Sequence, residues 1–136
     1  MATSTKDLLA QALGASHHGA EARRRATISR AYYAAYHRCR EWALSLPRST
    51  ETVSKAHGVH EQLIDRLANP PPSCPREKRK VARQLAGQLS ALKARRVAAD
   101  YKLRRAISEN EMRMQQSEAQ ELFAWCDGSR RPVRGP

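Results

Sequence analysis

The sequence predicts an all-α fold, an up-and-down antiparallel bundle of four to five helices, and three observations lead to this prediction. Strand signals are nearly absent, because the chain has one phenylalanine, few valines and isoleucines, and no useful alternating apolar run. Helix-forming Ala, Leu, Arg, Glu and Gln dominate the composition. Glycines and prolines cluster at a few points and so mark boundaries. The 136 residues suffice for one domain with one core, and no internal repeat or long linker suggests a second.

Two helices are predicted before Pro47. A short one runs from about Thr5 to Leu13 and is stopped by Gly14. After a turn at residues 14–19, a long helix runs from about Ala20 to Leu46. Its apolar residues recur every three or four positions, which is typical of a helix with one buried side: Ile28, Tyr32, Ala35, Cys39, Trp42 and Leu46.

Three further helices are predicted after residue 56. The first, about His57–Ala68, stops at Asn69 because three consecutive prolines follow and cannot continue a helix. The second starts at Pro75 or Arg76 and reaches about Ala99. The inward-facing residues of these two helices are predicted to be Val59, Leu63, Ile64 and Leu67, and then Val81, Leu85, Leu89 and Leu92.

The last predicted helix begins at Ser108 and runs to Cys126. Ser108 and Glu111 have the spacing of a capping box, in which each residue binds the backbone amide of the other. The Gly, Pro and Arg residues that follow predict a disordered basic tail over residues 127–136. The helical domain is therefore expected to occupy residues 1–126.

The charge balance points to a polyanionic partner. Twenty-five Lys and Arg oppose thirteen Asp and Glu, which gives a net charge of +12, and nucleic acid is the first candidate. Residues 76–105 hold eleven cations and two acidic residues, so nine of the surplus charges lie there. Alternatively this block is a solvated helix face, or it docks an acidic protein. The residues expected to contact RNA are Arg23, Arg24, Arg25, Lys78, Arg79, Lys80 and Arg83.

Several classes of protein are not indicated. No apolar run approaches the ~18 residues of a membrane span, and the first thirteen residues lack the apolar core of a signal peptide. Three widely spaced cysteines without a C-x-x-C pair favour reduced thiols in the cytoplasm, with Cys39 buried as a small hydrophobic residue. His57 and His60 form an H-x-x-H pair without nearby further ligands, so we expect neither a metal nor a cofactor.

The most informative stretch is the middle of the long predicted helix. Arg30 and His37 are seven residues apart, which is two helical turns, so they share a face. Tyr33 and Ala34 lie between them, roughly opposite the apolar stripe. A small alanine, a tyrosine, one cation and one imidazole are typical of a partner-facing surface, and a second copy of the chain is the simplest partner. Alternatively, Arg30 and His37 are solvated residues on the back of the helix.

Three segments resemble a known family. The run from Arg30 to His37, RAYYAAYH, resembles the R-x4-6-H motif of the HEPN superfamily, especially its stand-alone prokaryotic members. The residues His57, Gly58 and Val59 resemble the H-x-G-type segment that opens the next helix. The run from Arg96 to Tyr101, RVAADY, resembles the R-x-x-A-D-Y segment. The resemblance extends from about Ala20 to Cys126.

The resemblance implies a bundle that forms a homodimer through the long helix. It also implies metal-independent endoribonuclease activity, often as a toxin whose antitoxin is a minimal nucleotidyltransferase. Arg30 and His37 are then the expected catalytic residues, supported by Tyr33, Arg96, Asp100 and Tyr101. Alternatively, Asp100 only pairs with Arg96 or Arg104.

Other members of the superfamily have lost activity. The second expectation is therefore a non-catalytic interaction or nucleotide-binding module that partners a nucleotidyltransferase. One class of members carries a tyrosine two residues after the histidine, and its partner modifies that tyrosine. Here Cys39 occupies the position.

The implied chemistry suits these residue types. Without a metal, the ribose 2′-OH attacks the adjacent phosphate and leaves a 2′,3′-cyclic phosphate, and an imidazole can remove its proton near neutral pH. A guanidinium can hold the phosphate with two parallel hydrogen bonds as charge develops. Two-fold symmetry would bring two histidines and two arginines into one cleft.

Overall fold

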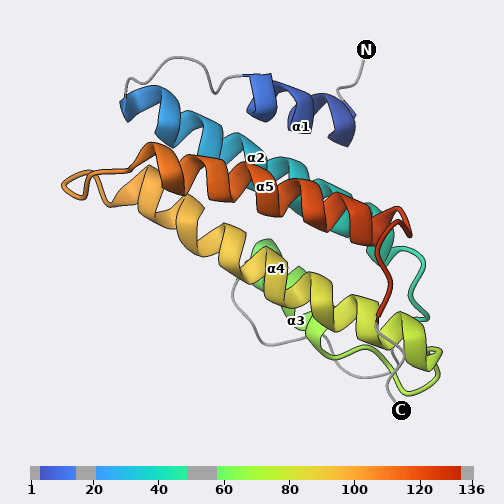
Figure 1. The fold of residues 1–136 in the computed structure, drawn as a ribbon. Coiled ribbons are helices and arrows are strands. Elements are labelled where there is room, and N and C mark those ends of the chain that lie inside the picture. Colours follow the sequence, from blue (N-terminus) through green and yellow to red (C-terminus); the bar gives the residue numbers. More distant parts are fainter. Residues whose placement is uncertain (1–3, 15–20, 49–57, 133–136) are drawn as a thin grey trace.

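The computed structural model describes residues 4–14, 21–48 and 58–132, and these residues form a helical bundle without strands (Figure 1). The all-α prediction is confirmed. The helices are α1 (Thr5–Gly14), α2 (Glu21–Ala43), α3 (Val59–Ala68), α4 (Arg76–Tyr101) and α5 (Glu109–Cys126). In space, α4 runs antiparallel to both α2 and α5, α1 lies along α2, and α3 lies behind α4 (Figure 1).

The helix ends follow local signals, with two shifts from the prediction. α2 ends at Ala43, earlier than predicted, because the next residues form a tight turn in which the amide of Leu46 donates to the carbonyl of Ala43 at 3.1 Å. α4 continues to Tyr101, two residues beyond the predicted end. The predicted turn at 14–19 lies almost entirely outside the described residues, and His57, the predicted start of the third helix, lies outside them too.

The capping box at the start of α5 is confirmed. The amide of Glu111 donates to the Ser108 hydroxyl at 3.1 Å, and the amide of Ser108 donates to the Glu111 carboxylate at 3.0 Å. These two bonds satisfy donors that the first turn of a helix leaves without partners. They also hold the loop of residues 102–108 at one end of the bundle.

The core contains most of the predicted apolar residues. Val59 is the clear exception, since it is 61% exposed at the first position of α3. Trp42, Ile64 and Val81 are only half-buried at the rim of the core. The predicted residues that the structure buries are Ile28, Tyr32, Ala35, Cys39, Leu46, Leu63, Leu67, Leu85, Leu89 and Leu92.

Two buried glutamines tie the helices together. The Gln115 amide donates to the carbonyls of Ile28 at 3.2 Å and Leu92 at 2.9 Å, and so joins α5 to α2 and α4. The Gln116 amide donates to the carbonyl of Ala12 at 2.7 Å and holds α1 in place. All three bonds satisfy side-chain amides in a buried setting, where an unpaired amide would be costly.

The first residues after α5, in the segment predicted to be a disordered tail, contact the bundle. Asp127 accepts a hydrogen bond from Arg38 at 2.9 Å, and Arg130 pairs with Glu121 at 3.0 Å. Residues 133–136 of the predicted tail lie outside the described residues. Across the described helices, none has the length and apolar character needed to span a membrane.

Candidate functional site

A cluster of aromatic rings lies where α2, α3 and α4 meet. We call it the tyrosine–histidine cluster, and it consists of Tyr32, Tyr33, Tyr36 and His37 of α2 with His60 of α3. The Tyr36 ring lies between the two imidazoles, 4.3 Å from His60 and 5.2 Å from His37 between ring centroids. The Tyr32 and Tyr33 rings lie 5.5 Å and 6.0 Å from His60. The cluster therefore brings two histidines from different helices to one tyrosine.

His60 was missed as a functional candidate from the sequence, where it was considered only as a metal ligand. The Tyr32 hydroxyl lies 2.7 Å from Nδ1 of His60, and the second ring nitrogen, Nε2, takes no part in this contact. A signal for its placement was available, because His60 lies three and seven residues before the buried Leu63 and Leu67. That spacing places the imidazole on the inward side of α3.

The surroundings of His60 favour its neutral form. Its pKa is lowered from the ordinary value, first by burial and then by the cations Arg96 and Lys93 of α4 and by His37 of α2. Glu61, next to it on α3, acts in the opposite direction. Burial also raises the pKa of the Tyr32 phenol well above its usual range, so this hydroxyl stays protonated. At neutral pH the pair is an uncharged imidazole held by an uncharged hydroxyl.

The residues predicted to support the site do lie together, around Arg96. Its guanidinium donates to the Asp100 carboxylate at 2.9 Å and to the Tyr33 hydroxyl at 2.8 Å. The guanidinium also lies 5.4 Å from the centre of the Tyr101 ring, although Tyr101 is 68% exposed. The Ser29 hydroxyl donates to the same carboxylate at 3.2 Å, so this network links α2 to α4. The alternative pairing of Asp100 with Arg96 is thus what the structure shows.

Arg96 is a strongly held cation. Burial lowers its pKa, but Tyr33, Asp100 and Tyr101 outweigh that effect, and the pKa is raised above its ordinary value. The side chain is only 14% exposed. Arg96 therefore positions Tyr33 and adds positive potential beside His60, while Asp100 and Tyr33 engage two of its five N–H donors.

Arg30 and His37 lie on the open side of α2, as the spacing predicted. Arg30 is exposed and makes no hydrogen bond or ion pair within the described ranges. It borders a shallow hollow of about 390 Å³ with Ala22, Arg23 and Ala26. His37, two turns further along, is half-buried beside Tyr36.

One part of the predicted face is wrong. Ala34 was placed on the open side, but it is fully buried in the core cluster that also contains Ala12 of α1. The reason is that α1 packs along α2 and covers the edge of this face. The same side of α2, here called the open stripe, therefore consists of exposed Arg23 and Arg30 together with half-buried Ala26, Tyr33 and His37.

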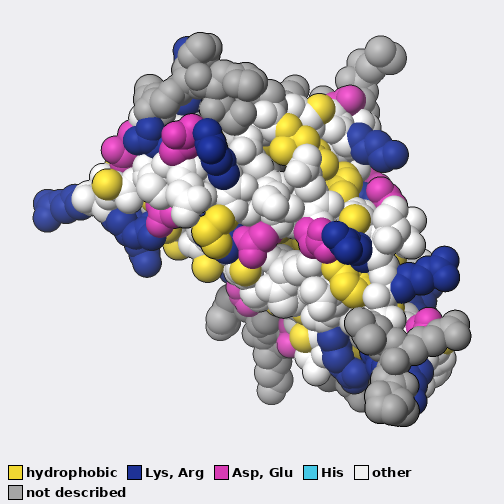
Figure 2. Space-filling model, in the orientation of Figure 1, with side chains coloured by type: hydrophobic (Ala, Val, Ile, Leu, Met, Phe, Trp, Pro, Cys, Tyr) yellow, Lys and Arg dark blue, Asp and Glu magenta, His cyan; other side chains and the backbone are white. Residues whose placement is uncertain are grey.

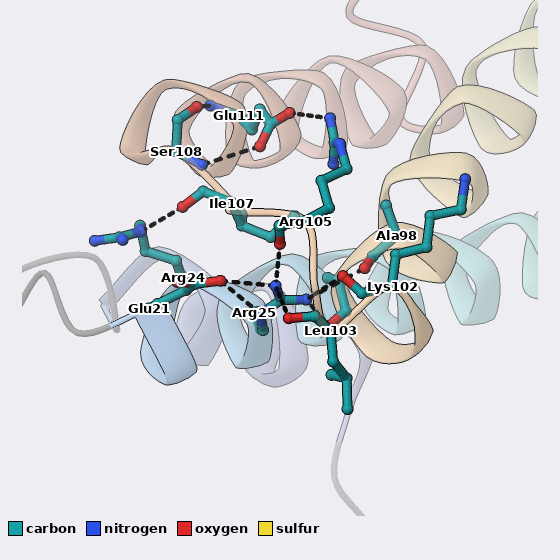
Figure 3. Close-up of polar contacts among 11 residues, drawn as sticks. Glu21, Arg24, Arg25, Ala98, Lys102, Leu103, Arg105, Ile107, Ser108 and Glu111 are labelled. Carbon is teal, nitrogen blue, oxygen red and sulfur yellow. Dashed lines mark hydrogen bonds and ion pairs between the residues drawn. The ribbon is translucent and has the colours of Figure 1, made fainter.

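Arg25 is not available to RNA, which corrects its prediction as a contact residue. Figure 3 shows its guanidinium among the backbone carbonyls of the loop between α4 and α5. It donates to Ala99 at 2.9 Å, to Lys102 at 3.4 Å and to Arg105, and it pairs with Glu21 at 2.7 Å. The side chain is 13% exposed. A cation at the C-terminal end of a helix satisfies unpaired carbonyls and complements the helix dipole.

The other residues predicted to contact RNA fall into two groups, those that are engaged or half-buried and those that are exposed. Arg24 donates to the carbonyl of Ile107 at 2.8 Å, and Lys78 donates to that of Ser45 at 2.8 Å. Arg79 and Lys80 are half-buried, whereas Arg23 and Arg83 are exposed.

The positive charge of residues 76–105 is partly neutralised by ion pairs. Lys93, Arg95 and Arg105 pair with Glu61, Glu118 and Glu111, respectively. On the face drawn in Figure 2, most Lys and Arg side chains lie towards the ends of the molecule, and the middle carries apolar and acidic side chains with a basic side chain beside the acidic ones. This face therefore offers no continuous track for an RNA backbone.

The cysteines are not arranged for metal binding. Cys39, Cys74 and Cys126 are buried free thiols, as expected for Cys39. A hydrogen bond with Cys126, together with burial, raises the pKa of the Cys39 thiol. Over residues 4–14, 21–48 and 58–132, the His, Cys, Asp and Glu side chains form no group of three that could hold a metal.

Comparisons with known proteins give no relative for this chain: no family model, no curated protein and no solved structure matches it.

Proposed function

We propose that this chain is a metal-independent endoribonuclease whose acid–base pair is His37 and His60. The observation that carries the proposal is the approach of both imidazoles to Tyr36, from two different helices, next to the open stripe of α2. The net charge of +12 and the resemblance of the Arg30–His37 and Arg96–Tyr101 segments to the HEPN superfamily support it. Two histidines suffice for both proton transfers of RNA cleavage without a metal.

Each proposed role follows from the surroundings of the group. His60, kept neutral, removes the proton from the ribose 2′-OH. The ribose 2′-oxygen then forms a bond to phosphorus. The bond from phosphorus to the 5′-oxygen breaks, and His37 acts as the acid that gives a proton to that leaving oxygen. Arg30 holds the non-bridging phosphate oxygens, because its guanidinium is exposed and unengaged within the described ranges. The products are a 2′,3′-cyclic phosphate end and a 5′-hydroxyl end.

In this proposal a second copy of the chain packs against the open stripe of α2. A two-fold axis there would place two Arg30 and His37 pairs in one cleft. The facing arginines repel each other until an RNA phosphate lies between them. RNA should therefore strengthen dimer formation, and sedimentation measurements with and without a non-cleavable RNA can detect this.

The test of the proposal is cleavage of end-labelled RNA in EDTA by purified protein. His37→Gln and His60→Gln should each lower the rate by about 100-fold or more, because each removes one proton-transfer group. Arg66→Gln on the exposed side of α3 is the matched control and should cleave like the wild type. Full activity of both histidine variants, or cleavage only after Mg²⁺ is added, would overturn the proposal.

One observation favours a second candidate function. Arg96, one of the two cations that lower the pKa of His60, is already engaged by Asp100 and Tyr33 and is mostly buried, as in a structural network. A non-catalytic interaction module that partners a nucleotidyltransferase would need this network only for its fold. Absence of cleavage by a folded wild-type dimer, with co-purification of a nucleotidyltransferase-type partner, would favour this second function.

A further inference from the structure

Both tryptophans of the chain border one hollow, open to solvent and here called the cavity, at the end of the bundle away from the 102–108 loop. The cavity has a volume of about 270 Å³. Trp42 comes from the last turn of α2 and Trp125 from the last turn of α5, while Lys78 comes from the first turn of α4. The segment after α5 closes one side with Arg130 and Arg131. Residues far apart in the sequence thus build one hollow.

The lining combines aromatic surface with positive charge. Lys78, Arg130 and Arg131 face one acidic residue, Glu77, so the cavity carries a surplus of two positive charges. Figure 2 shows dark blue side chains gathered at this end of the molecule. Indole faces stack on nucleobases of any type, and nearby cations bind the phosphate that follows a base.

The three cations of the cavity differ in whether they already have polar partners in the protein. Arg130 is held by the Glu121 carboxylate at 3.0 Å. Lys78 donates to the Ser45 carbonyl and lies 6.0 Å from the centre of the Trp42 ring. Arg131 is exposed and makes no polar contact with the described part of the chain. Neither indole N–H donates a hydrogen bond within that part.

We propose that this cavity binds a single nucleotide, with its base on the indole surface of Trp42 or Trp125 and its phosphate against Arg131 and Lys78. The volume lies just below the range of small-molecule pockets, about 300–1,000 Å³, and therefore suits one nucleotide better than a larger cofactor. The nucleotide can be free or part of a single-stranded RNA. The site is separate from His37 and His60 and does not depend on the proposed cleavage activity.

Intrinsic fluorescence tests the proposal directly, because both tryptophans of the protein lie in the cavity. The probes are AMP, a short 2′-O-methyl oligoadenylate that cannot be cleaved, and inorganic phosphate. AMP or the oligonucleotide should quench the emission in a saturable way, and phosphate should not. Equal saturation by AMP and the oligonucleotide indicates a free nucleotide as ligand, and binding of the oligonucleotide alone indicates a strand.

Charge reversal separates the cavity from the general charge of the protein. Arg131→Glu should weaken binding about tenfold, whereas Arg66→Glu, with the same change in net charge on the exposed side of α3, should change it little. Because Trp125 is half-buried, Trp125→Ala is used only where circular dichroism shows a folded protein, and it should also weaken binding about tenfold.

The outcomes distinguish this proposal from the proposed function. His37→Gln should bind the oligonucleotide like the wild type even if it no longer cleaves RNA. Absence of quenching by both nucleotide probes would overturn the proposal, and so would equal weakening by Arg131→Glu and Arg66→Glu. Saturable quenching by phosphate alone would also overturn it, because the base would then contribute nothing.

Discussion

Arg25 and Arg30 lie on the same helix, five residues apart, and have opposite environments. Five residues correspond to a rotation of about 140° around the helix axis, so the two side chains leave α2 on different sides. Arg25 turns towards the loop that joins α4 to α5 and binds several of its carbonyls (Figure 3). Arg30 turns to the open stripe and has no polar partner within the described ranges.

Basic residues that lie close together in the sequence therefore need not belong to the same surface. The end of α4 presents backbone carbonyls without helical partners, and the chain uses one arginine to satisfy them. Arg30 lies in the middle of α2, where no unpaired carbonyls surround it, and its guanidinium stays available. The positive charge that stabilises one region is therefore unavailable to a ligand, and the charge that could bind a ligand adds little to stability.

The largest effect is expected from removing the buried cation. Arg25→Ala should lower the free energy of unfolding by about 3 kcal/mol, because several charge-assisted hydrogen bonds to the loop are lost together. Arg30→Ala, the matched change on the other side of α2, should alter it by less than about 0.5 kcal/mol. Urea unfolding of both variants measures this difference, and equal losses would show that the comparison between the two arginines is wrong.

A smaller effect is expected at the other end of the same loop. Ser108→Ala removes the hydroxyl that accepts the Glu111 amide and should lower the free energy of unfolding by about 1 kcal/mol. Ser108→Asp, which keeps an acceptor at the cap, should restore most of the loss. If Ser108→Ala were as costly as Arg25→Ala, the cap and not the arginine would be the main support of the loop.

The smallest effect is expected from the protonation of half-buried His60. Its pKa is lowered in the folded state, so below the ordinary value of 6.5 the unfolded chain binds more protons than the folded one. Stability from this group is complete above about pH 6.5 and is lost as pH falls towards the lowered pKa. Urea unfolding at pH 7.5 and pH 5.5 should show a larger acid-induced loss for the wild type than for His60→Gln. An equal or smaller loss would mean that burial and the cations Arg96 and Lys93 do not disfavour the imidazolium.

The buried role of Arg25 could have been read from the sequence by extending the apolar stripe of α2 backwards. Arg25 lies three residues before Ile28 and seven before Tyr32, which are both fully buried, so it belongs to the inward side. The same argument places His60 with Leu63 and Leu67. In both cases a polar residue on an apolar side was the available signal, but the spacing alone did not reveal its partners.

Other features could not be derived from spacing. Ala34 lies within about 40° of Arg30 on the helix wheel, and only the position of α1 decides that one is covered and the other is not. The meeting of Trp42, Lys78 and Trp125 depends on how the ends of three helices come together. None of these residues is close to the others in the sequence.

By itself, the sequence determined the helices, the capping box at Ser108 and most of the residues that enter the core. These depend on local propensity, on hydrogen bonds within a few residues and on a periodicity that a single helix already has. Only the tertiary structure decided which cations remain free and which histidine joins His37 at Tyr36. Those outcomes depend on which backbone carbonyls and rings the neighbouring helices bring to each side chain, and the sequence of one helix does not contain that information.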